Sequence, residues 1–442
     1  MSATQRIVAA VVLAIVVLAV AVLALGAAGA PIGLGPDASA DASTEAPPSA
    51  ETSPQPGLPS GEPSADEASP DDADVLAQLT EIEEQVVGIR GLEAADIGPA
   101  DIITRAELGE ELQALFDEQY PPDERERDNR ALRALGLLAA DEDVAELQLQ
   151  LLGDQVLGFY DPIEERMVVV TDAGLDAAAK LTYAHEYTHA LQDAAFDPPH
   201  FDPDADLEDD EALALTSLTE GDATVTMFAW AFEHLSQEEL MEIGAGQQLP
   251  DATGIPAWMV NQLLFPYTTG QVWASSLTGQ NPLAPVFDEI DAAYADPPES
   301  TEQIIHLDAW EPREEPEPVE VADLVAVLGD GWEEVDDTPI GEASIGFILE
   351  HFGIARDQAN DAAGGWGGDR VRIATGPDGA FAVAWRLAWD TPEDASAFLA
   401  SYESVIEELP FPALISPVGS DEVLVVHASD DVILREVAGA AD

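Results

Sequence analysis

His185, Glu186 and His189 form an H-E-x-x-H motif inside the stretch LTYAHEYTHALQDAAFD, residues 181–197. Residues four apart lie on one face of a helix, one turn above the other, so both imidazoles can reach the same metal ion. Glu186 lies about 100° around the helix from His185, where its carboxylate can reach a metal-bound water. Zinc lowers the pKa of such a water, and the glutamate takes its proton as general base. The motif therefore predicts a hydrolytic Zn²⁺ site.

The residues around the motif favour a largely buried helix. Alanines at 177–179 precede it, Ala190 and Leu191 continue it, and Pro198 ends it. The alternative is that the motif consists of polar residues on an exposed helix face. The flanking Ala, Leu, Tyr and Thr residues, which are not charged, argue against that alternative.

A catalytic zinc ion needs a third protein ligand and an open coordination position. The pattern H-E-x-x-H-x-x-G-x-x-H is excluded, because Gln192 and Ala195 occupy its Gly and last His positions. Glu220 lies in a helical stretch at 211–230, and its neighbours one turn away are apolar or weakly polar. Its carboxylate should therefore point inward, where it needs a cation.

Two neighbours of Glu220 add to this prediction. Gly221 weakens a helix, which indicates that another segment approaches closely there. Asp222 is the second choice as the third ligand, although it faces about 200° away from Glu220. The alternative to a metal site is a structural hydrogen-bond network around Glu220.

With H-E-x-x-H on one helix and a glutamate on a following one, the chain resembles the gluzincin branch of the zincin metallopeptidases. The resemblance implies that His185, His189 and Glu220 bind zinc and that Glu186 is the general base. Thr224 departs from the better-known E-x-x-x-D pattern, since it occupies the Asp position. The carboxylate that would orient a ligand histidine is therefore unassigned, with Asp193 and Asp222 as candidates.

More closely, the chain resembles a group of exported or membrane-anchored metallopeptidase-like proteins of bacteria and haloarchaea. The shared segments extend over most of the chain after residue 76 and read GFYDP, HEYTHALQD, TEGDAT, FPYTTG, PPESTEQIIH and GWGGDR. This group has no established substrate, so the resemblance bears on the chemistry rather than on the biological role.

Two further residues are candidates for stabilising the oxyanion of the transition state. Tyr267 lies in FPYTTG, and a Tyr or His often donates this hydrogen bond in gluzincins. His306 lies on a helix that Ser300 and Gln303 begin with a capping box. The alternative for both residues is ordinary packing.

The composition constrains the partners of the protein. The 442 residues include 88 acidic and 15 basic side chains, which gives a net charge of −73, and no cysteine. Such a field repels nucleic acid and anionic lipid, so we expect no nucleic-acid partner. With 46% hydrophobic residues, the bulk of the chain should fold with a carboxylate-rich, halophile-like surface. The chain contains neither disulfides nor thiol chemistry.

The N-terminal sequence predicts a membrane anchor. Residues 7–25 are uncharged and apolar after Arg6, long enough at about 28 Å to cross a bilayer. Residues 1–26 are thus a single-pass anchor with the body outside the cell, and a cleaved signal peptide with a secreted body is the alternative. Residues 27–72 read as a disordered acidic linker rich in Pro and Ser.

The remaining sequence predicts an α+β protein with two domains. Residues 73–312 form a mainly helical, zincin-like domain with a hairpin at 156–170, to whose edge an extended substrate could add as a strand. Residues 313–442 form a small α+β domain with an antiparallel sheet. Its expected elements are helices at 343–360 and 392–409 and strands at 370–374, 380–389, 422–427 and 431–436.

These patterns predict a membrane-anchored, extracytoplasmic zinc endopeptidase that acts on a peptide or protein substrate. Two other functions stay open at this point. One is a catalytically degenerate zincin that serves as a binding or scaffold module of the cell envelope, and the other is a zinc amidase of cell-wall peptides. The sequence determines neither the cleavage preference nor the oligomeric state.

Overall fold

The computed structural model describes residues 70–441, apart from 153–156, 172–173, 204, 247–252 and 280. The predicted anchor and nearly all of the predicted linker lie outside these residues. Within the described part, no helix combines the length and the apolar character needed to cross a bilayer.

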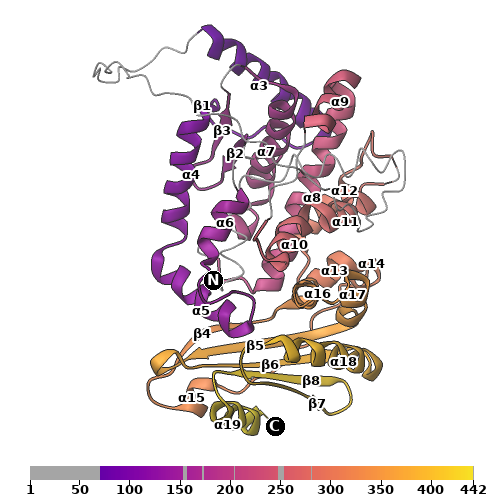
Figure 1. The fold of residues 1–442 in the computed structure, drawn as a ribbon. Coiled ribbons are helices and arrows are strands. Elements are labelled where there is room, and N and C mark those ends of the chain that lie inside the picture. Colours follow the sequence, from indigo (N-terminus) through magenta and orange to yellow (C-terminus); the bar gives the residue numbers. More distant parts are fainter. Residues whose placement is uncertain are drawn as a thin grey trace, which may run out of the picture.

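A mainly helical body occupies the upper part of Figure 1. The sequence before the H-E-x-x-H segment predicts helices at 75–87, 105–120, 128–138 and 144–152. All four are present, although the third begins at Pro122, earlier than predicted. The helices of the body are α3 (Pro70–Arg90), α4 (Arg105–Gln119), α5 (Pro122–Leu135), α6 (Val144–Leu152), α7 (Ala177–Phe196), η2 (Pro199–Phe201), α8 (Asp209–His234), α9 (Gln237–Gly246), α10 (Ala257–Phe265), the π-helix η3 (Pro266–Gly270), α11 (Gln271–Leu277), α12 (Asp288–Ala295), α13 (Thr301–Ile305) and α14 (Leu307–Trp310).

A three-stranded sheet packs against α7. The predicted hairpin is confirmed, with β2 (Gly158–Asp161) antiparallel to β3 (Arg166–Val170). The sequence did not indicate β1 (Asp101–Ile103), which pairs with β3 in parallel and gives the order β1-β3-β2. One edge of β2 is therefore unpaired within this sheet, on the strand that contacts α7.

The C-terminal part contains the predicted antiparallel sheet, so the α+β class is confirmed. Its five strands run in the order β4-β5-β6-β8-β7, and every neighbouring pair is antiparallel. They are β4 (Glu333–Thr338), β5 (Trp366–Thr375), β6 (Phe381–Trp389), β7 (Ala413–Val418) and β8 (Glu422–Ala428). The accompanying helices are α15 (Leu324–Leu328), α16 (Gly341–His351), α17 (Arg356–Ala363), η4 (Pro377–Gly379), α18 (Pro392–Glu408) and α19 (Asp431–Ala441).

Two predictions for this region are wrong. Residues 431–436, predicted as a strand, begin helix α19, because Asp430 accepts hydrogen bonds from the N–H groups of Val432 and Ile433 and so caps a helix. Val437 then packs on the sheet at helical spacing. The single helix predicted at 343–360 is two helices, α16 and α17, with Gly353 at φ +87° between them.

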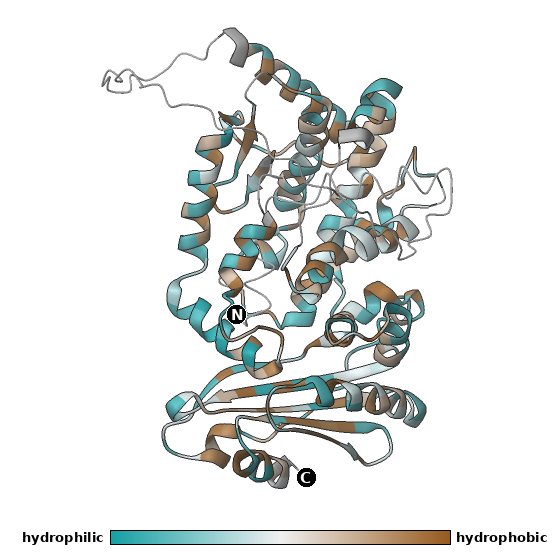
Figure 2. Ribbon diagram, viewed as in Figure 1, coloured by the Kyte–Doolittle hydropathy of each residue, from teal (hydrophilic) through white to brown (hydrophobic). Residues whose placement is uncertain are grey.

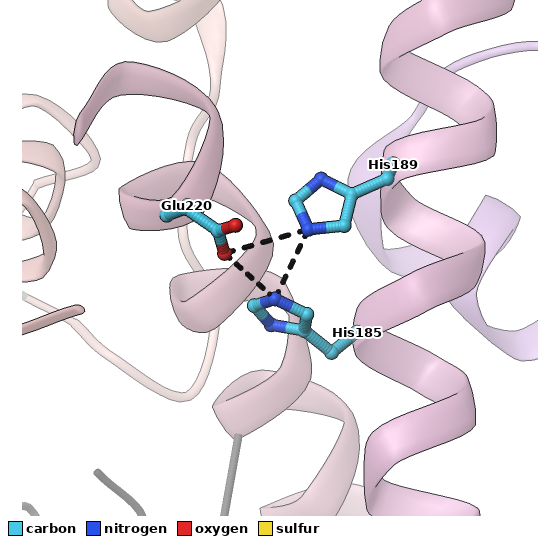
Figure 3. A group of neighbouring side chains, drawn as sticks. All are labelled: His185, His189 and Glu220. Carbon is cyan, nitrogen blue, oxygen red and sulfur yellow. Dashed lines mark hydrogen bonds and ion pairs between the residues drawn. The ribbon is translucent and has the colours of Figure 1, made fainter. Parts of the chain in front are cut away.

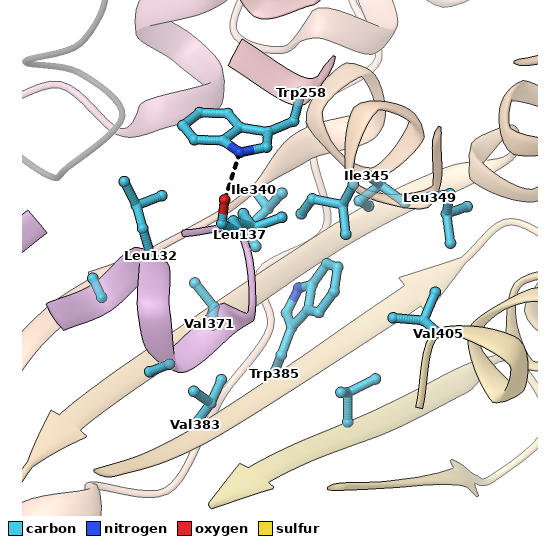
Figure 4. Packing of buried hydrophobic residues seen from close by; sticks show 14 of the residues in the cluster. Leu132, Leu137, Trp258, Ile340, Ile345, Leu349, Val371, Val383, Trp385 and Val405 are labelled. Atoms are coloured by element: carbon cyan, nitrogen blue, oxygen red, sulfur yellow. Dashed lines mark hydrogen bonds between the residues drawn. The ribbon is translucent and has the colours of Figure 1, made fainter. Parts of the chain in front are cut away.

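The C-terminal sheet is buried on both faces, because its strands alternate between two cores. In β6, Val383 and Trp385 face a core shared with α5, α10, α16 and α18 (Figure 4). Ala382 and Ala384 face the opposite core, under α15 and α19. Figure 2 shows hydrophobic residues along these strands and mostly hydrophilic ones on α5. The larger core joins residues from both sides of position 312, the predicted domain boundary.

The GWGGDR segment joins this sheet to the helical body. The buried Asp369 carboxylate accepts hydrogen bonds from the N–H groups of Ile340 and Gly341, where α16 begins, and from two tryptophan indoles. Arg370 forms an ion pair with Glu208, the N-cap residue of α8, at 2.8 Å. Thr338 of β4 accepts from the first N–H of that helix, on Asp209. The sheet thus anchors the start of α8, on which Glu220 lies.

His427 makes the contact between sheet and body sensitive to pH. Its ring lies 3.1 Å from the Ala134 carbonyl oxygen of α5 and 3.1 Å from the Tyr402 hydroxyl. Burial lowers the pKa of His427 from 6.5 to about 4, so the folded protein holds it neutral. The unfolded chain takes up this proton first, so the free energy of unfolding should fall as pH drops from 6.5 to 4. The contribution at pH 4.5 is about 2–3 kcal/mol.

Urea unfolding of the wild type and of His427→Asn at pH 7 and pH 4.5 measures this contribution. The Asn side chain can still donate to Ala134, but it does not titrate. We expect the variant to lose less stability between the two pH values than the wild type does. The many carboxylates are common to both proteins and cancel in the comparison. An equal loss in both proteins would rule out His427 as the source.

Candidate metal centre

Two packed helices supply the central residues of the site. Helix α7 carries His185, Glu186 and His189, and Asp176 caps its start by accepting from the Ala179 N–H. It ends at Asp197, whose φ of +49° turns the chain before Pro198. Helix α8 packs along α7 and carries Glu220. All four side chains are buried.

The two predicted ligand histidines and Glu220 converge on one point, as Figure 3 shows. The Nε2 atoms of His185 and His189 are 3.1 Å apart. One oxygen of Glu220 lies 2.9 Å from His185 Nε2 and 3.4 Å from His189 Nε2. Among the described residues, this is the one group of three or more His, Cys, Asp or Glu side chains whose ligand atoms lie close enough together to hold a metal ion.

The spacing of the three atoms fits a tetrahedral ion. Ligand atoms about 2.05 Å from a tetrahedral zinc are about 3.3 Å apart, close to all three distances. Both histidines direct the same ring nitrogen to the shared point, and the donor set of two imidazoles and one carboxylate is that of a known class of catalytic zinc site. The group can hold a metal ion, with Glu220 as the third ligand.

The electrostatics of the group also call for a cation. Burial alone raises the pKa of Glu220, but His189 and His185 outweigh this effect and lower it to about 2. Burial alone lowers the pKa of His189, but Glu220 outweighs it and raises this pKa to about 9. The pKa of His185 is lowered by its burial. Glu220 thus keeps its negative charge with a positive partner, and a metal ion at the shared point would supply that charge in place of the proton.

Glu186 faces the edge of β2. Its Oε2 accepts a hydrogen bond from the backbone N–H of Tyr160 at 3.1 Å. Burial raises the pKa of Glu186 to about 8, which is consistent with a group that exchanges protons near neutral pH. The hydroxyl of Tyr160 donates to Asp193 at 2.6 Å. Asp193, one of the two candidates for orienting a histidine, therefore holds Tyr160 instead.

Tyr267 lies at the metal centre, as a residue of the π-helix η3. Its ring centroid is 6.1 Å from that of His185. Burial, together with the nearby carboxylates of Glu220 and Glu186, raises its pKa well above the usual value. Its hydroxyl therefore stays protonated and is a hydrogen-bond donor at the site. Single-turn π-helices often occur at functional sites.

Close contact between α8 and η3 brings Tyr267 to the site. A Cβ atom on Gly221 would lie 2.5 Å from the carbonyl oxygen of Gly270, and a Cβ on Gly270 would lie 2.7 Å from that of Ser217. The expectation that another segment approaches Gly221 closely is therefore confirmed. Two glycines let the backbones of the two elements touch.

Asp222, the other candidate for orienting a histidine, acts through a residue that the sequence did not indicate. Gln192 Oε1 lies 2.8 Å from His189 Nδ1, and Gln192 Nε2 donates to Asp222 at 2.9 Å. His185 Nδ1 and the hydroxyl of Thr224 are buried without a hydrogen-bond partner among the described residues. Thr224 therefore makes no hydrogen bond to either ligand histidine.

Two other histidines lie in the helical body, and the sequence had indicated only His306. His306 ends α13 and pairs with Glu342 of α16 at 2.9 Å, and its contacts join it to that helix rather than to the metal group. His200, which no motif indicated, lies in η2 with its Nε2 3.1 Å from the Thr219 hydroxyl. Burial lowers its pKa to about 3, and the charges of Glu220 and His189 act on it. The sequence indicated only that helix α7 ends before Pro198, after which η2 carries His200.

The match that comparison with known proteins found lies in the C-terminal part of the chain. The sequence model of a family described as a domain of unknown function (DUF8575) matches residues 327–438, which include the five-stranded sheet. No curated protein and no solved structure matches the chain. The metal group lies outside the matched residues.

The contact of Gly221 with Gly270 can be tested by adding one methyl group. Gly221→Ala should separate α8 from η3, lower the free energy of unfolding by about 1–3 kcal/mol and weaken metal binding. Gly244→Ala is the matched control, because Gly244 is also helical and nothing lies within 4 Å of its added Cβ. The control should be neutral or slightly stabilising. Urea unfolding and metal titration measure both effects, and equal stability of the two variants would contradict the steric argument.

Proposed function

We propose that the protein is a zinc-dependent endopeptidase with a zincin-like catalytic body. The observation that carries this proposal is the convergence of His185, His189 and Glu220, with Glu186 on the same helix as the two histidines. A site that served only structure would need no proton-accepting carboxylate beside the ligands. A bound zinc ion would lower the pKa of a water ligand and polarise the substrate carbonyl.

The side chains of the site then divide the chemistry among them. Glu186 removes a proton from the attacking water and later delivers it to the leaving amine, so the C–N bond breaks to give a carboxylate and an amine. The N–H of Tyr160 holds Glu186 in place between these steps. Tyr267 is the donor that we assign to the oxyanion, since it lies beside Glu220 and Glu186.

The edge of β2 supports a peptide as the substrate. The hydrogen bond from Val170 N–H to the Leu157 carbonyl marks this pair as bonded across the hairpin. By the alternation of an antiparallel ladder, Gly158 and Tyr160 turn their backbone groups away from β3, toward the unpaired edge, where the N–H of Tyr160 already donates to Glu186. An extended peptide can add to such an edge with its scissile bond near the metal. On the full chain, residues 7–25 would hold this body at the outer face of a membrane.

Metal content tests the ligand set. The purified full chain, kept at high salt, should bind one zinc ion, and Glu220→Ala should lose it or bind it at least about 100-fold more weakly. Glu233→Ala is the control, because Glu233 is an exposed carboxylate on the same helix. Atomic emission and zinc titration give stoichiometry and affinity. Zinc retained by Glu220→Ala would move the third ligand elsewhere, and absence of zinc from every protein would refute the metal centre.

Removal of the general base tests the reaction. Glu186→Gln keeps the shape of the side chain and an oxygen that can accept from Tyr160, but it cannot take a proton. Hydrolysis of unstructured protein substrates should fall by about 10²–10⁴-fold while one zinc ion stays bound. The measurement pairs a peptide-release assay with metal analysis of the same samples. Undiminished hydrolysis by this variant would exclude Glu186 as the base.

A further inference from the structure

We propose that Asp193 is a positioning residue of the site, and that its hydrogen bond with the Tyr160 hydroxyl fixes the backbone N–H that holds Glu186. The inference rests on the proposed function, because it gives Asp193 a part in the reaction through the general base. The hydrogen bond of Asp193 joins it to strand β2 and not to a metal ligand. Its effect therefore passes through one residue, Tyr160.

Tyr160 contacts helix α7 at two points. Its backbone N–H donates to Glu186 at 3.1 Å, and its hydroxyl donates to Asp193 at 2.6 Å. Glu186 and Asp193 are seven residues apart, so they lie on the same face of α7, two turns and about 10 Å from each other. A residue held at two points this far apart cannot pivot on the helix, whereas the N–H contact alone would allow it to pivot.

The hairpin does not fix this N–H by itself. Strand β2 has four residues, and the hydrogen bond from Val170 to Leu157 sets the alternation of its ladder with β3. At Tyr160 the backbone groups point away from β3, so the ladder bonds hold the residues on either side rather than this peptide group. The side-chain bond to Asp193 supplies the constraint that the ladder leaves out.

The position of the N–H matters because it sets the direction of a buried carboxylate. Glu186 is 3% exposed and accepts from Tyr160 through Oε2. A general base must lie within hydrogen-bond reach of the proton that it removes, and a displacement of about 1 Å can cost about 100-fold in rate. Loss of the Asp193 contact should therefore slow the chemical step. It should affect peptide affinity less, because Gly158, paired with Val169 of β3, still offers its backbone groups at the edge.

A different role for Asp193 can be separated from this one. Asp193 lies one turn after His189, where a carboxylate could orient that ligand instead. In the structure, the Nδ1 atom of His189 faces Gln192 at 2.8 Å. Removal of the Asp193 carboxylate should therefore leave the affinity for zinc nearly unchanged, whereas loss of a group that orients a ligand weakens metal binding by about 10–100-fold.

Steady-state kinetics of the full chain on labelled casein, at high salt, tests the positioning role. In Asp193→Ala, kcat should fall by about 10–100-fold, while KM stays within about threefold and zinc affinity within about twofold of the wild type. Asp193→Asn keeps an oxygen that can accept from the Tyr160 hydroxyl. This conservative variant should therefore recover most of kcat.

Removal of the other partner gives the matched comparison. Tyr160→Phe should resemble Asp193→Ala, and the double variant should be no slower than either single variant, because both changes remove the same bond. Tyr120→Phe is the control, since it also removes a buried hydroxyl that donates to an aspartate, Asp128, at 2.7 Å. That pair joins α4 to α5, so kcat of the control should stay within about twofold of the wild type while its stability falls.

Amide hydrogen exchange gives a readout that does not depend on hydrolysis. With ¹⁵N in its tyrosines, the chain has seven labelled residues, and Tyr160→Phe assigns the signal of Tyr160 by removing it. In Asp193→Ala, the Tyr160 amide should exchange at least about 10-fold faster than in the wild type. The Tyr183 amide, inside helix α7, should keep its rate and so show that the change is local.

The outcomes are distinct. Additive losses of kcat in the double variant, unchanged kcat and exchange in Asp193→Ala, or a loss of zinc affinity above about tenfold in that variant would each overturn the inference. The kinetics of Tyr160→Phe decide if Asp193→Ala does not fold. If the zinc-bound wild type cleaves no casein or other unstructured protein, the proposed function fails, and the exchange rate of the Tyr160 amide then decides whether Asp193 holds this N–H.

Discussion

A buried carboxylate between two imidazoles is the constraint on which the rest of the site depends. Glu220 lies within hydrogen-bond distance of His185 and is fully buried, so its charge must be balanced locally. Either a proton on His189 or a metal ion at the shared point provides that balance. The neighbouring elements hold the three ligand atoms at this spacing, since a small displacement would leave a buried charge without its partner.

Backbone contacts also hold the residues around Glu220 in place. Gly221 and Gly270 let α8 and the π-helix touch, which places Tyr267 beside the Glu220 carboxylate. On the other side of α7, the edge strand β2 holds Glu186 through the N–H of Tyr160. Glu186 of α7 is thus held by β2, whereas η3, which packs on α8, supplies Tyr267, the donor that we assign to the oxyanion. Their positions rest on backbone contacts, which change less readily than those of side chains on loops.

The C-terminal sheet packs against the helical body and holds the start of helix α8. Arg370 and Thr338 hold the start of α8, twelve residues before Glu220 at Glu208, and one hydrophobic core joins the sheet to α5 and α10. The region matched by a family of unknown function therefore supports the helix that supplies the third ligand. At the other end of the body, α3 contributes Arg90, which pairs with Asp222, the carboxylate that accepts from Gln192. Elements far apart in the sequence thus contribute charged residues to the surroundings of one buried site.

The sequence by itself determined the local part of this protein. Helical spacing was sufficient to predict that His185 and His189 face one metal point, with Glu186 beside them. The apolar neighbours of Glu220 predicted that its side chain points inward. Only the tertiary structure decided the partners of these residues, because Gln192, Asp222 and Arg90 meet through packing between three helices. Residues 431–436 begin with the local cap of Asp430, but their helix buries Val437 against a sheet whose strands come from far earlier in the chain. Spacing along a helix is a local property, whereas charge balance in a buried site depends on residues that only folding brings together.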